Sequence, residues 1–299
     1  MDQKLILGID IGGTHITAAC VDLNKNMILP NTLTRVELDS KADLESIMHF
    51  WTHAILQSCS TLAKTPNYIG IAMPGPMDYE KGICMIKGQD KYGALFGLNI
   101  KELLASRLHI NVNHIGFVND AVAFLSGEIL GGAASNGHNV IGLTLGTGLG
   151  SAMMLNKESV TDADLWKLPF KNAIAEEYLS TRWFVKSYFH KTAIEIKNVK
   201  ELFFLAEGGD TQALEVFREF GVNLGLFLQS FIALTGKIDT VVLGGSIAKS
   251  IQFFKADLIG ALGQDNQIEI YQALLAENAA LLGAAGLWKN KNLTYSPIA

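Results

Sequence analysis

The chain has 299 residues, of which 49% are hydrophobic and 18% are charged, and its formal net charge at pH 7 is −5. This length is sufficient for two domains, and the composition is that of a globular protein and not of a disordered one. The acidic balance and the lack of a Lys/Arg cluster exclude the electrostatic pattern of a nucleic-acid-binding protein.

The first half of the chain alternates apolar strands with amphipathic helices. In chain order, the sequence predicts strands at 4–11, 15–22 and 27–38, a helix at 40–64, a strand within 67–78, a glycine-rich loop at 74–98, a helix at 99–108, a strand at 113–119 and a helix at 120–130. Ser40 is the expected N-cap of the first helix, and Pro30 marks the third strand as an edge or a bulge. Such alternation predicts a mostly parallel sheet and an α/β fold.

The opening strand–turn–strand pattern returns in the second half. The segment "VIGLTLGTGLGSAMMLNK" matches "LILGIDIGGTHITAACVDLNK" at an offset of 134, which places Gly12 on Gly146 and Ala18 on Ala152. Two such hairpins about one domain apart indicate a duplicated architecture with one glycine turn from each half. Further elements are predicted as helices at 174–190, 198–207 and 210–235, a strand–turn–helix unit at 238–250 and a last helix at 276–290.

Three glycine turns need one explanation. They lie at 10–14, 146–150 and 243–246. A dinucleotide fingerprint needs G-x-G-x-x-G opening a helix, and a Walker A loop needs G-K-[ST]; the chain has neither. Glycine turns between strands can instead cradle phosphate with backbone N–H groups, to which Thr14 or Thr147 adds a hydroxyl. Asp10 would repel phosphate directly, but it can hold Mg²⁺ through water. The alternative for each turn alone is an ordinary hairpin.

A second acidic residue lies in "FVNDAVAF", where a strand gives way to a helix. Phosphoryl transfer to a hydroxyl needs a carboxylate that accepts the proton of that hydroxyl, and Asp120 is the candidate. The alternative role for Asp120 is capping of the helix that begins there.

Six motifs span nearly the whole chain. They are "DIGGTHI" at 10–16, "IAMPGPMD" at 71–78, "VNDAVAFLSGE" at 118–128, "LTLGTGLGSAMM" at 143–154, "VVLGGSIA" at 241–248 and "LLGAAGLW" at 281–288. In this order they resemble the ROK family (repressors, open reading frames and kinases) of sugar kinases. The resemblance implies a two-domain actin-like ATPase (ribonuclease H-like) fold, with duplicated mixed sheets flanked by helices and an active site in the interdomain cleft. We place the domains at 1–118 and 119–279, with a C-terminal helix at about 280–299 packing back on the first.

The resemblance also implies a site. It implies a sugar bound by Gly75, Asn119 and Asp120, with Asp120 as the catalytic base. The implied ATP-binding residues are Gly12, Gly13, Thr14, Gly146, Thr147, Gly148, Gly244, Gly245 and Ser246. Mg-ATP is the expected cofactor, a small-molecule sugar the expected substrate and a homodimer the expected assembly.

The chain departs from the family pattern after its second phosphate turn. The family continues into a G-E-x-G-H segment, whose Glu and His contact the sugar, and then into a Cys/His zinc loop. Here the segment reads "TDADLWKLPFKNAIAEEYLST". Asp164 is our candidate for the sugar-binding role of the Glu, and structural zinc is not expected. His15 also stands where the family often has Lys.

These features predict an ATP-dependent kinase that phosphorylates a hexose or hexose derivative, in the manner of a glucokinase. The alternative is a non-catalytic relative, either a sugar-sensing regulator or a pseudokinase that binds nucleotide or sugar without turnover. Family repressors carry an N-terminal helix-turn-helix, whereas this chain opens on its first strand.

The cysteine pattern and hydropathy bear on localisation. The three cysteines are far apart and form no C-x-x-C pair, which disfavours a thiolate zinc site and favours a reducing cytoplasm. The apolar stretch in "MDQKLILGID" is too short for a signal peptide, and no apolar run is long enough to span a membrane. A cytoplasmic protein is expected.

Overall fold

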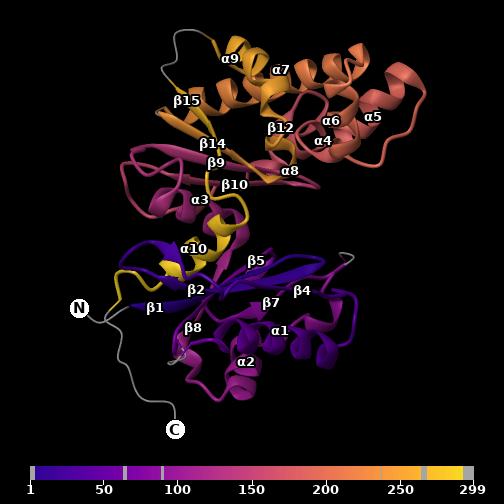
Figure 1. Cartoon of the computed structure of the whole chain (residues 1–299). Coiled ribbons are helices and arrows are strands. Elements are labelled where there is room, and N and C mark those ends of the chain that lie inside the picture. The colour runs from indigo at the N-terminus through magenta and orange to yellow at the C-terminus, as the bar shows by residue number, and fades with distance from the viewer. Residues whose placement is uncertain (1–3, 63–65, 89–90, 237, 264–267, 292–299) are drawn as a thin grey trace. The chain divides into compact units, whose positions relative to one another are not determined.

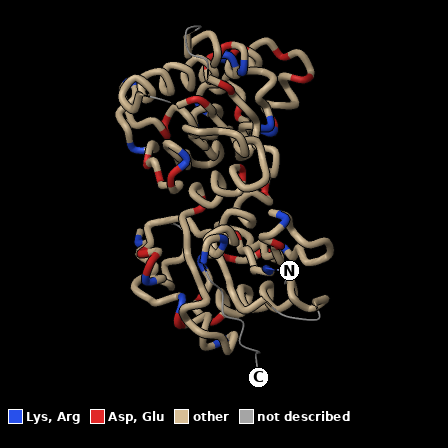
Figure 2. Tube along the Cα trace, turned by 90° about the vertical axis from the view of Figure 1, so that its left-hand side faces the viewer, with Lys and Arg blue, Asp and Glu red and all other residues tan. Residues whose placement is uncertain are grey.

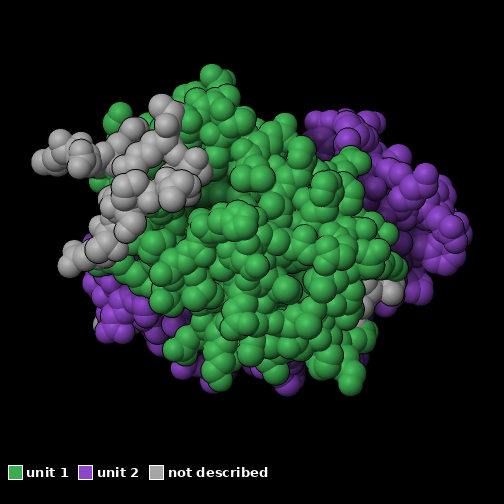
Figure 3. Space-filling view, turned by 90° about the horizontal axis from the view of Figure 1, so that it is seen from below, with its two compact units in different colours: residues 1–135, 277–299 green, residues 136–276 purple. Residues whose placement is uncertain are grey.

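The computed structural model describes residues 4–62, 66–88, 91–236, 238–263 and 268–291. The chain divides into two compact units, coloured separately in Figure 3. Unit 1 comprises Met1–Ser135 and Glu277–Ala299, and unit 2 comprises Asn136–Ala276. The predicted domain boundary after residue 118 differs from this division, because the helix that begins at Asp120 packs against the last helix of the chain in unit 1.

Unit 1 is an α/β unit built on one mixed sheet (Figure 1). Its elements are β1 (Leu5–Ile11), β2 (His15–Asp22), β3 (Met27–Ile28), β4 (Thr34–Glu37), α1 (Leu44–Cys59), β5 (Ile69–Met73), β6 (Met77–Asp78), β7 (Ile83–Cys84), η1 (Gly93–Leu95), α2 (Ile100–Leu108), η2 (Val112–His114), β8 (Ile115–Asn119), α3 (Asp120–Gly131) and α10 (Asn278–Gly286). The strand order is β3-β2-β1-β5-β8, with β4 also paired to β2.

The strands of this sheet bring the candidate residues of unit 1 to one edge. β1 and β2 form an antiparallel hairpin, whereas β1, β5 and β8 are parallel. In register, Asp10 pairs with Ala72, and Met73 pairs with Asn119. Because parallel strands end at a common edge, Asp10, Met73 and Asn119 all lie at the carboxyl edge of the sheet.

Helices cover both faces of the sheet of unit 1. α1 and α2 lie on one face, and α3 and α10 lie on the other (Figure 1). The approach of α10 is unusually close, because a Cβ added to Gly70 would lie 2.0 Å from the carbonyl oxygen of Ala284. Small residues on both sides therefore let the helix backbone rest directly on the strands.

Unit 2 repeats this plan. Its elements are β9 (Val140–Leu145), β10 (Leu149–Met154), β11 (Thr161–Asp162), η3 (Leu165–Lys167), β12 (Pro169–Phe170), β13 (Ala173–Ile174), α4 (Ala175–Tyr178), α5 (Thr181–Thr192), α6 (Val199–Glu207), α7 (Thr211–Thr235), β14 (Thr240–Gly244), α8 (Gly245–Ala248), η4 (Ile251–Phe253), α9 (Lys255–Leu262) and β15 (Glu269–Gln272). The strand order is β11-β10-β9-β14-β15, in which β9 and β10 are antiparallel and β9, β14 and β15 are parallel.

The core of unit 2 is rich in aromatic side chains. Phe184 of α5 packs against Phe217 and Phe220 of α7, with ring centroids 5.2 and 4.6 Å apart.

Acidic and basic residues are interspersed along the trace of each unit (Figure 2). Among the described residues, no helix combines the length and apolarity needed to cross a membrane.

The two hairpins correspond, although their turns differ in length. In the first, Ile11 pairs with Ile16, and in the second, Leu145 pairs with Leu149, so the second turn is one residue shorter. The offset of 134 therefore holds through the first strand of each hairpin only. The predicted match of Ala18 with Ala152 is wrong, because Ala18 lies opposite Ile9, whereas Ser151 lies opposite Leu143, the counterpart of Ile9.

Three predicted elements have other bounds in the structure. The strand expected at 27–38 is two strands, β3 and β4, with Pro30 between them. The N-cap of α1 is Asp43 and not Ser40, since the Asp43 side chain accepts from the Ser46 N–H. The helix expected at 174–190 is broken into α4 and α5, because the Thr181 N–H donates to the glycine turn of β9 and β10.

Candidate functional site

The first glycine turn joins β1 to β2 and presents an open surface. Gly13 and Thr14 are exposed, and a Cβ on Gly13 would meet no atom of the described residues within 4 Å. Two hydrogen bonds fix the backbone of the turn. The Gly12 carbonyl accepts from the Tyr92 hydroxyl, and the Thr14 carbonyl accepts from Leu38 N–H at 2.9 Å. A fixed backbone with an open outer side is the arrangement that lets N–H groups approach an anion.

His15 occupies the last position of this turn. Its Nδ1 lies 2.8 Å from the Thr14 hydroxyl, and its Nε2 lies 3.8 Å from a carboxylate oxygen of Glu37. The imidazole is thus bound on both sides by residues of the same sheet edge. This contact orients the Thr14 hydroxyl, which is one of the predicted phosphate-binding groups.

Asp10 is a partly buried residue of β1, one position before the strand ends at Ile11. The pKa of its carboxyl is raised from 3.8 to about 7, chiefly by burial and then by the charges of Asp120 and Glu277, whereas the charge of Arg35 lowers it. Arg35 also forms an ion pair with Glu277. Because the charge of Asp120 disfavours ionisation of Asp10, a cation bound beside them would stabilise both carboxylates.

Asn119 and Asp120 divide two roles at the start of α3. The Oδ1 of Asn119 accepts from the N–H groups of Ala121 at 2.8 Å and Val122 at 3.2 Å, so Asn119 is the N-cap. Asp120 is the first residue of the helix, and its Oδ1 accepts from Ala121 N–H at 2.9 Å. The alternative role of Asp120 as the cap is therefore wrong. The helix dipole stabilises a negative charge at this position.

Gly75 lies in the loop that follows β5, close to a tyrosine that no motif contains. A Cβ on Gly75 would lie 3.2 Å from the hydroxyl of Tyr79. That hydroxyl donates to the Met73 carbonyl at 3.0 Å and accepts from Asn119 Nδ2 at 3.3 Å. The structure therefore brings Asn119 and Gly75 together through Tyr79.

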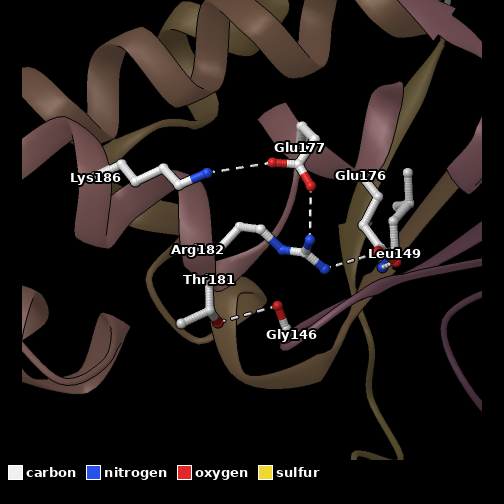
Figure 4. Close-up of polar contacts among 7 residues, drawn as sticks. All are labelled: Gly146, Leu149, Glu176, Glu177, Thr181, Arg182 and Lys186. Atoms are coloured by element: carbon white, nitrogen blue, oxygen red, sulfur yellow. Dashed lines mark hydrogen bonds and ion pairs between the residues drawn. The ribbon is translucent and has the colours of Figure 1, made fainter. Parts of the chain in front are cut away.

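The second glycine turn, at 146–148, is held by residues from α4 and α5 (Figure 4). The Gly146 carbonyl accepts from Thr181, both from the backbone N–H at 2.8 Å and from the hydroxyl at 3.0 Å. On its other side, Glu176 Oε2 accepts from Leu149 N–H at 3.0 Å. A Cβ on Gly148 would lie 2.7 Å from that carboxylate oxygen, so only glycine fits there without displacing Glu176.

A chain of ion pairs continues from this turn. Arg182 bridges Glu176 and Glu177 at 2.9 and 2.6 Å, and Lys186 contacts Glu177 at 3.4 Å (Figure 4). No sequence motif indicates Glu176 or Thr181, because they lie 27 and 35 positions from the turn residues that they contact.

The third glycine turn lies beside the second in unit 2. Gly245 has a φ of +85°, and a Cβ on it would lie 2.3 Å from the Leu145 carbonyl oxygen. The Ser246 hydroxyl lies 3.7 Å from the position of a Cβ on Gly146. The structure therefore gathers the predicted ATP-binding residues of unit 2, and these include Gly244 at the end of β14.

Asp164 lies in unit 2, whereas Gly75, Asn119 and Asp120 lie in unit 1. It precedes η3 with a φ of +53° and forms an ion pair with Lys167. Its predicted sugar-binding role stays a prediction.

The residues present fit a bound Mg-ATP. Mg²⁺ in phosphate sites is held by one or two carboxylates together with water and the phosphates, which matches Asp10. Among the described residues, no group of three or more His, Cys, Asp and Glu side chains could hold a metal by itself. Within the two turns, the N–H groups of Gly12 and Gly146 donate to the carbonyls of His15 and Gly148, so the N–H groups of the residues that follow each glycine are the candidate donors to phosphate.

Comparison with known proteins shows what the chain resembles. Over 97% of its length it is 23% identical to the glucokinase of Thermotoga maritima, of which it covers 99%. Over 94% of its length it is 22% identical to the xylose repressor of Bacillus subtilis, of which it covers 76%. Among solved structures, a ROK family glucokinase from Streptomyces griseus in complex with glucose and AMPPNP is similar with a TM-score of 0.75 at 22% identity, covering 95% of this chain and 98% of that one.

The sheet of each unit, with a glycine turn in its first hairpin, defines an α/β protein with the actin-like ATPase fold, as the sequence predicted. The model of the ROK family matches residues 6–163 and 171–291, so the chain belongs to the ROK family. Within that family it is sugar kinase-like, and repressors are also among its relatives.

Proposed function

We propose that this chain is an ATP-dependent kinase that phosphorylates a hydroxyl of a hexose or hexose derivative. The single observation that carries the proposal is that Asn119, and not Asp120, is the N-cap of α3. Asn119 caps the helix, and this leaves the Asp120 carboxylate at the first helical position, beside Asp10. A carboxylate that the fold does not need as a cap, at the edge where β1 and β8 end, is suited to accept a proton.

In the proposed reaction, the Asp120 carboxylate accepts the proton of the sugar hydroxyl. The hydroxyl oxygen then forms a bond to the γ-phosphorus of ATP as the bond from that phosphorus to the bridging oxygen breaks, which leaves ADP. The turns at 12–14 and 146–148 bind the phosphates, and 244–246 binds the adenosine. Mg²⁺, held by Asp10 through water, would neutralise charge on the phosphate oxygens.

Two similarities support this proposal. The Streptomyces griseus neighbour binds glucose and AMPPNP, and the Thermotoga maritima relative is a glucokinase. Both similarities cover nearly the whole chain. Because the relatives include both a glucokinase and an N-acetyl-D-glucosamine kinase, the substrate panel covers both sugar classes. A homodimer remains a prediction from the resemblance, and sedimentation would test it.

The test is ADP release with Mg-ATP over a panel of hexoses, N-acetylhexosamines and fructose. We expect one sugar class to raise turnover above the background ATPase rate, and Asp120→Asn to lower kcat by at least ~10²-fold. Asp39→Asn is the matched control, because it makes the same change at an exposed turn of the same unit. Wild-type turnover in Asp120→Asn would show that Asp120 is not the base.

The alternative is a regulator or pseudokinase, which the similarity to the xylose repressor favours. A sugar that raises the Tm of the protein without supporting any ADP release would favour it over the kinase.

A further inference from the structure

Tyr79 lies in the proposed sugar site, although it belongs to no glycine turn and to no acidic pair. Its hydroxyl contacts the ends of two neighbouring strands, since Met73 ends β5 and Asn119 ends β8, and these two residues are paired in register. The side chain is partly buried, and a Cβ on residue 75 would lie 3.2 Å from its hydroxyl, closer than an ordinary van der Waals contact. Gly75 therefore makes room for the Tyr79 hydroxyl.

The direction of each hydrogen bond follows from the donors available. The Tyr79 hydroxyl has one hydrogen, which it donates to the Met73 carbonyl at 3.0 Å, so toward Asn119 it acts as acceptor. The Asn119 Oδ1 already accepts from two backbone N–H groups of α3. The side-chain amide of Asn119 is thus fixed with its oxygen on the helix and its Nδ2 on the tyrosine.

We propose that Tyr79 is a positioning residue for the sugar site: it holds the Asn119 side chain so that the second N–H of Nδ2 is a donor toward a substrate hydroxyl. Asn119 then offers a donor and Asp120 an acceptor, on adjacent residues of one edge. The helix cap fixes one end of the Asn119 amide, and Tyr79 fixes the other. The kinetic part of this proposal rests on the proposed function, whereas the hydrogen bond itself does not.

Two measurements on Tyr79→Phe test the proposal. The first is the NMR signal of the Asn119 side-chain NH₂ in the full-length protein without ligand, assigned by its loss in Asn119→Ala. The variant keeps the aromatic ring, so we expect this signal to shift and its hydrogen exchange to accelerate. Tyr68→Phe is the matched control, because Tyr68 precedes the opposite end of β5 and should leave the signal in place.

The second measurement is the kinetics with the sugar that the wild type accepts. We expect Tyr79→Phe to raise the KM for sugar by ~3–10-fold with little change in the KM for ATP, as removal of one hydrogen bond predicts. In an Asn119→Ala background the same change should have no further effect, since the tyrosine would act through the asparagine.

An Asn119 signal that does not move in Tyr79→Phe overturns the proposal, whatever the activity. A lower Tm with unchanged sugar KM, or additive effects of the two substitutions, overturns it as well, because either would show that Tyr79 only holds its own loop. If the wild type shows no sugar-dependent turnover, the proposed function fails, and the NMR measurement alone decides the role of Tyr79.

Discussion

Removal of Glu176 most directly tests the proposed role of the second glycine turn in binding phosphate. Its carboxylate accepts from Leu149 N–H at 3.0 Å and pairs with Arg182 at 2.9 Å (Figure 4). Glu176→Ala deletes both contacts and leaves the N–H of the buried Leu149 without this acceptor. A hydrogen bond to a charged group is worth about 1.5–3 kcal/mol, and the partly exposed ion pair adds at most about 1 kcal/mol. We therefore expect the free energy of unfolding to fall by ~2–3 kcal/mol.

The same substitution should weaken nucleotide binding, because the turn at 146–148 loses its support on the Glu176 side. We expect the Kd for Mg-AMPPNP, measured by calorimetry, to rise by ~10-fold, which corresponds to about 1.4 kcal/mol. The Tm should fall by ~4–12 °C, since each kcal/mol shifts the Tm of a domain of this size by about 2–4 °C. Glu176→Gln keeps an acceptor for Leu149 and should show a smaller loss of both.

Glu177 provides the control for this experiment. It contacts the same Arg182, at 2.6 Å, and Lys186 at 3.4 Å, and neither contact involves the turn. Glu177→Ala should leave the Kd for Mg-AMPPNP unchanged. The reasoning is refuted if Glu176→Ala binds as tightly as the wild type, or if Glu177→Ala weakens binding by the same factor.

Three further predictions follow from burial and packing. The raised pKa of Asp10 means that the folded protein loses stability as the pH rises from about 4 to 7, by up to ~4 kcal/mol, and Asp10→Asn removes that loss. Melting without Mg²⁺ should show Asp10→Asn above the wild type at pH 8 and near it at pH 4, and equal Tm values at both would contradict the shift. The buried Ser180 hydroxyl has no hydrogen-bond partner among the described residues, so Ser180→Ala should stabilise by ~1 kcal/mol, and a lower Tm would reveal a partner. Gly70→Ala should cost ~3 kcal/mol because of the contact with Ala284, whereas Gly93→Ala, whose Cβ would meet no described atom within 4 Å, should not, and similar Tm values for the two would contradict the close packing of α10.

Local sequence patterns were sufficient to predict most of the strands, helices and turns of the fold. Buried strands of a parallel sheet are continuous apolar runs, and glycine turns need backbone freedom at particular positions, so both are visible without a structure. The pairing of two strand–turn–strand units predicted the duplicated α/β fold, which the sheets of both units confirm. The predicted bounds of an element were wrong where one of its residues bonds to a residue far away in the sequence. An example is Thr181, whose N–H donates to the Gly146 carbonyl at the point where one predicted helix is two helices in the structure.

For the site, the sequence alone determined the types of residue and their order: three glycine turns, Asp10 before the first, and Asn119-Asp120 between a strand and a helix. Only the tertiary structure decided that Asn119 and not Asp120 caps α3, that Tyr79 holds Asn119 across 40 positions, and that Glu176 holds the second turn across 27. The physical reason is that a cap or a supporting hydrogen bond is defined by the direction of a donor toward its acceptor. That direction is set by the strands and helices that bring distant residues together, and it leaves no trace in the spacing of the residues along the chain.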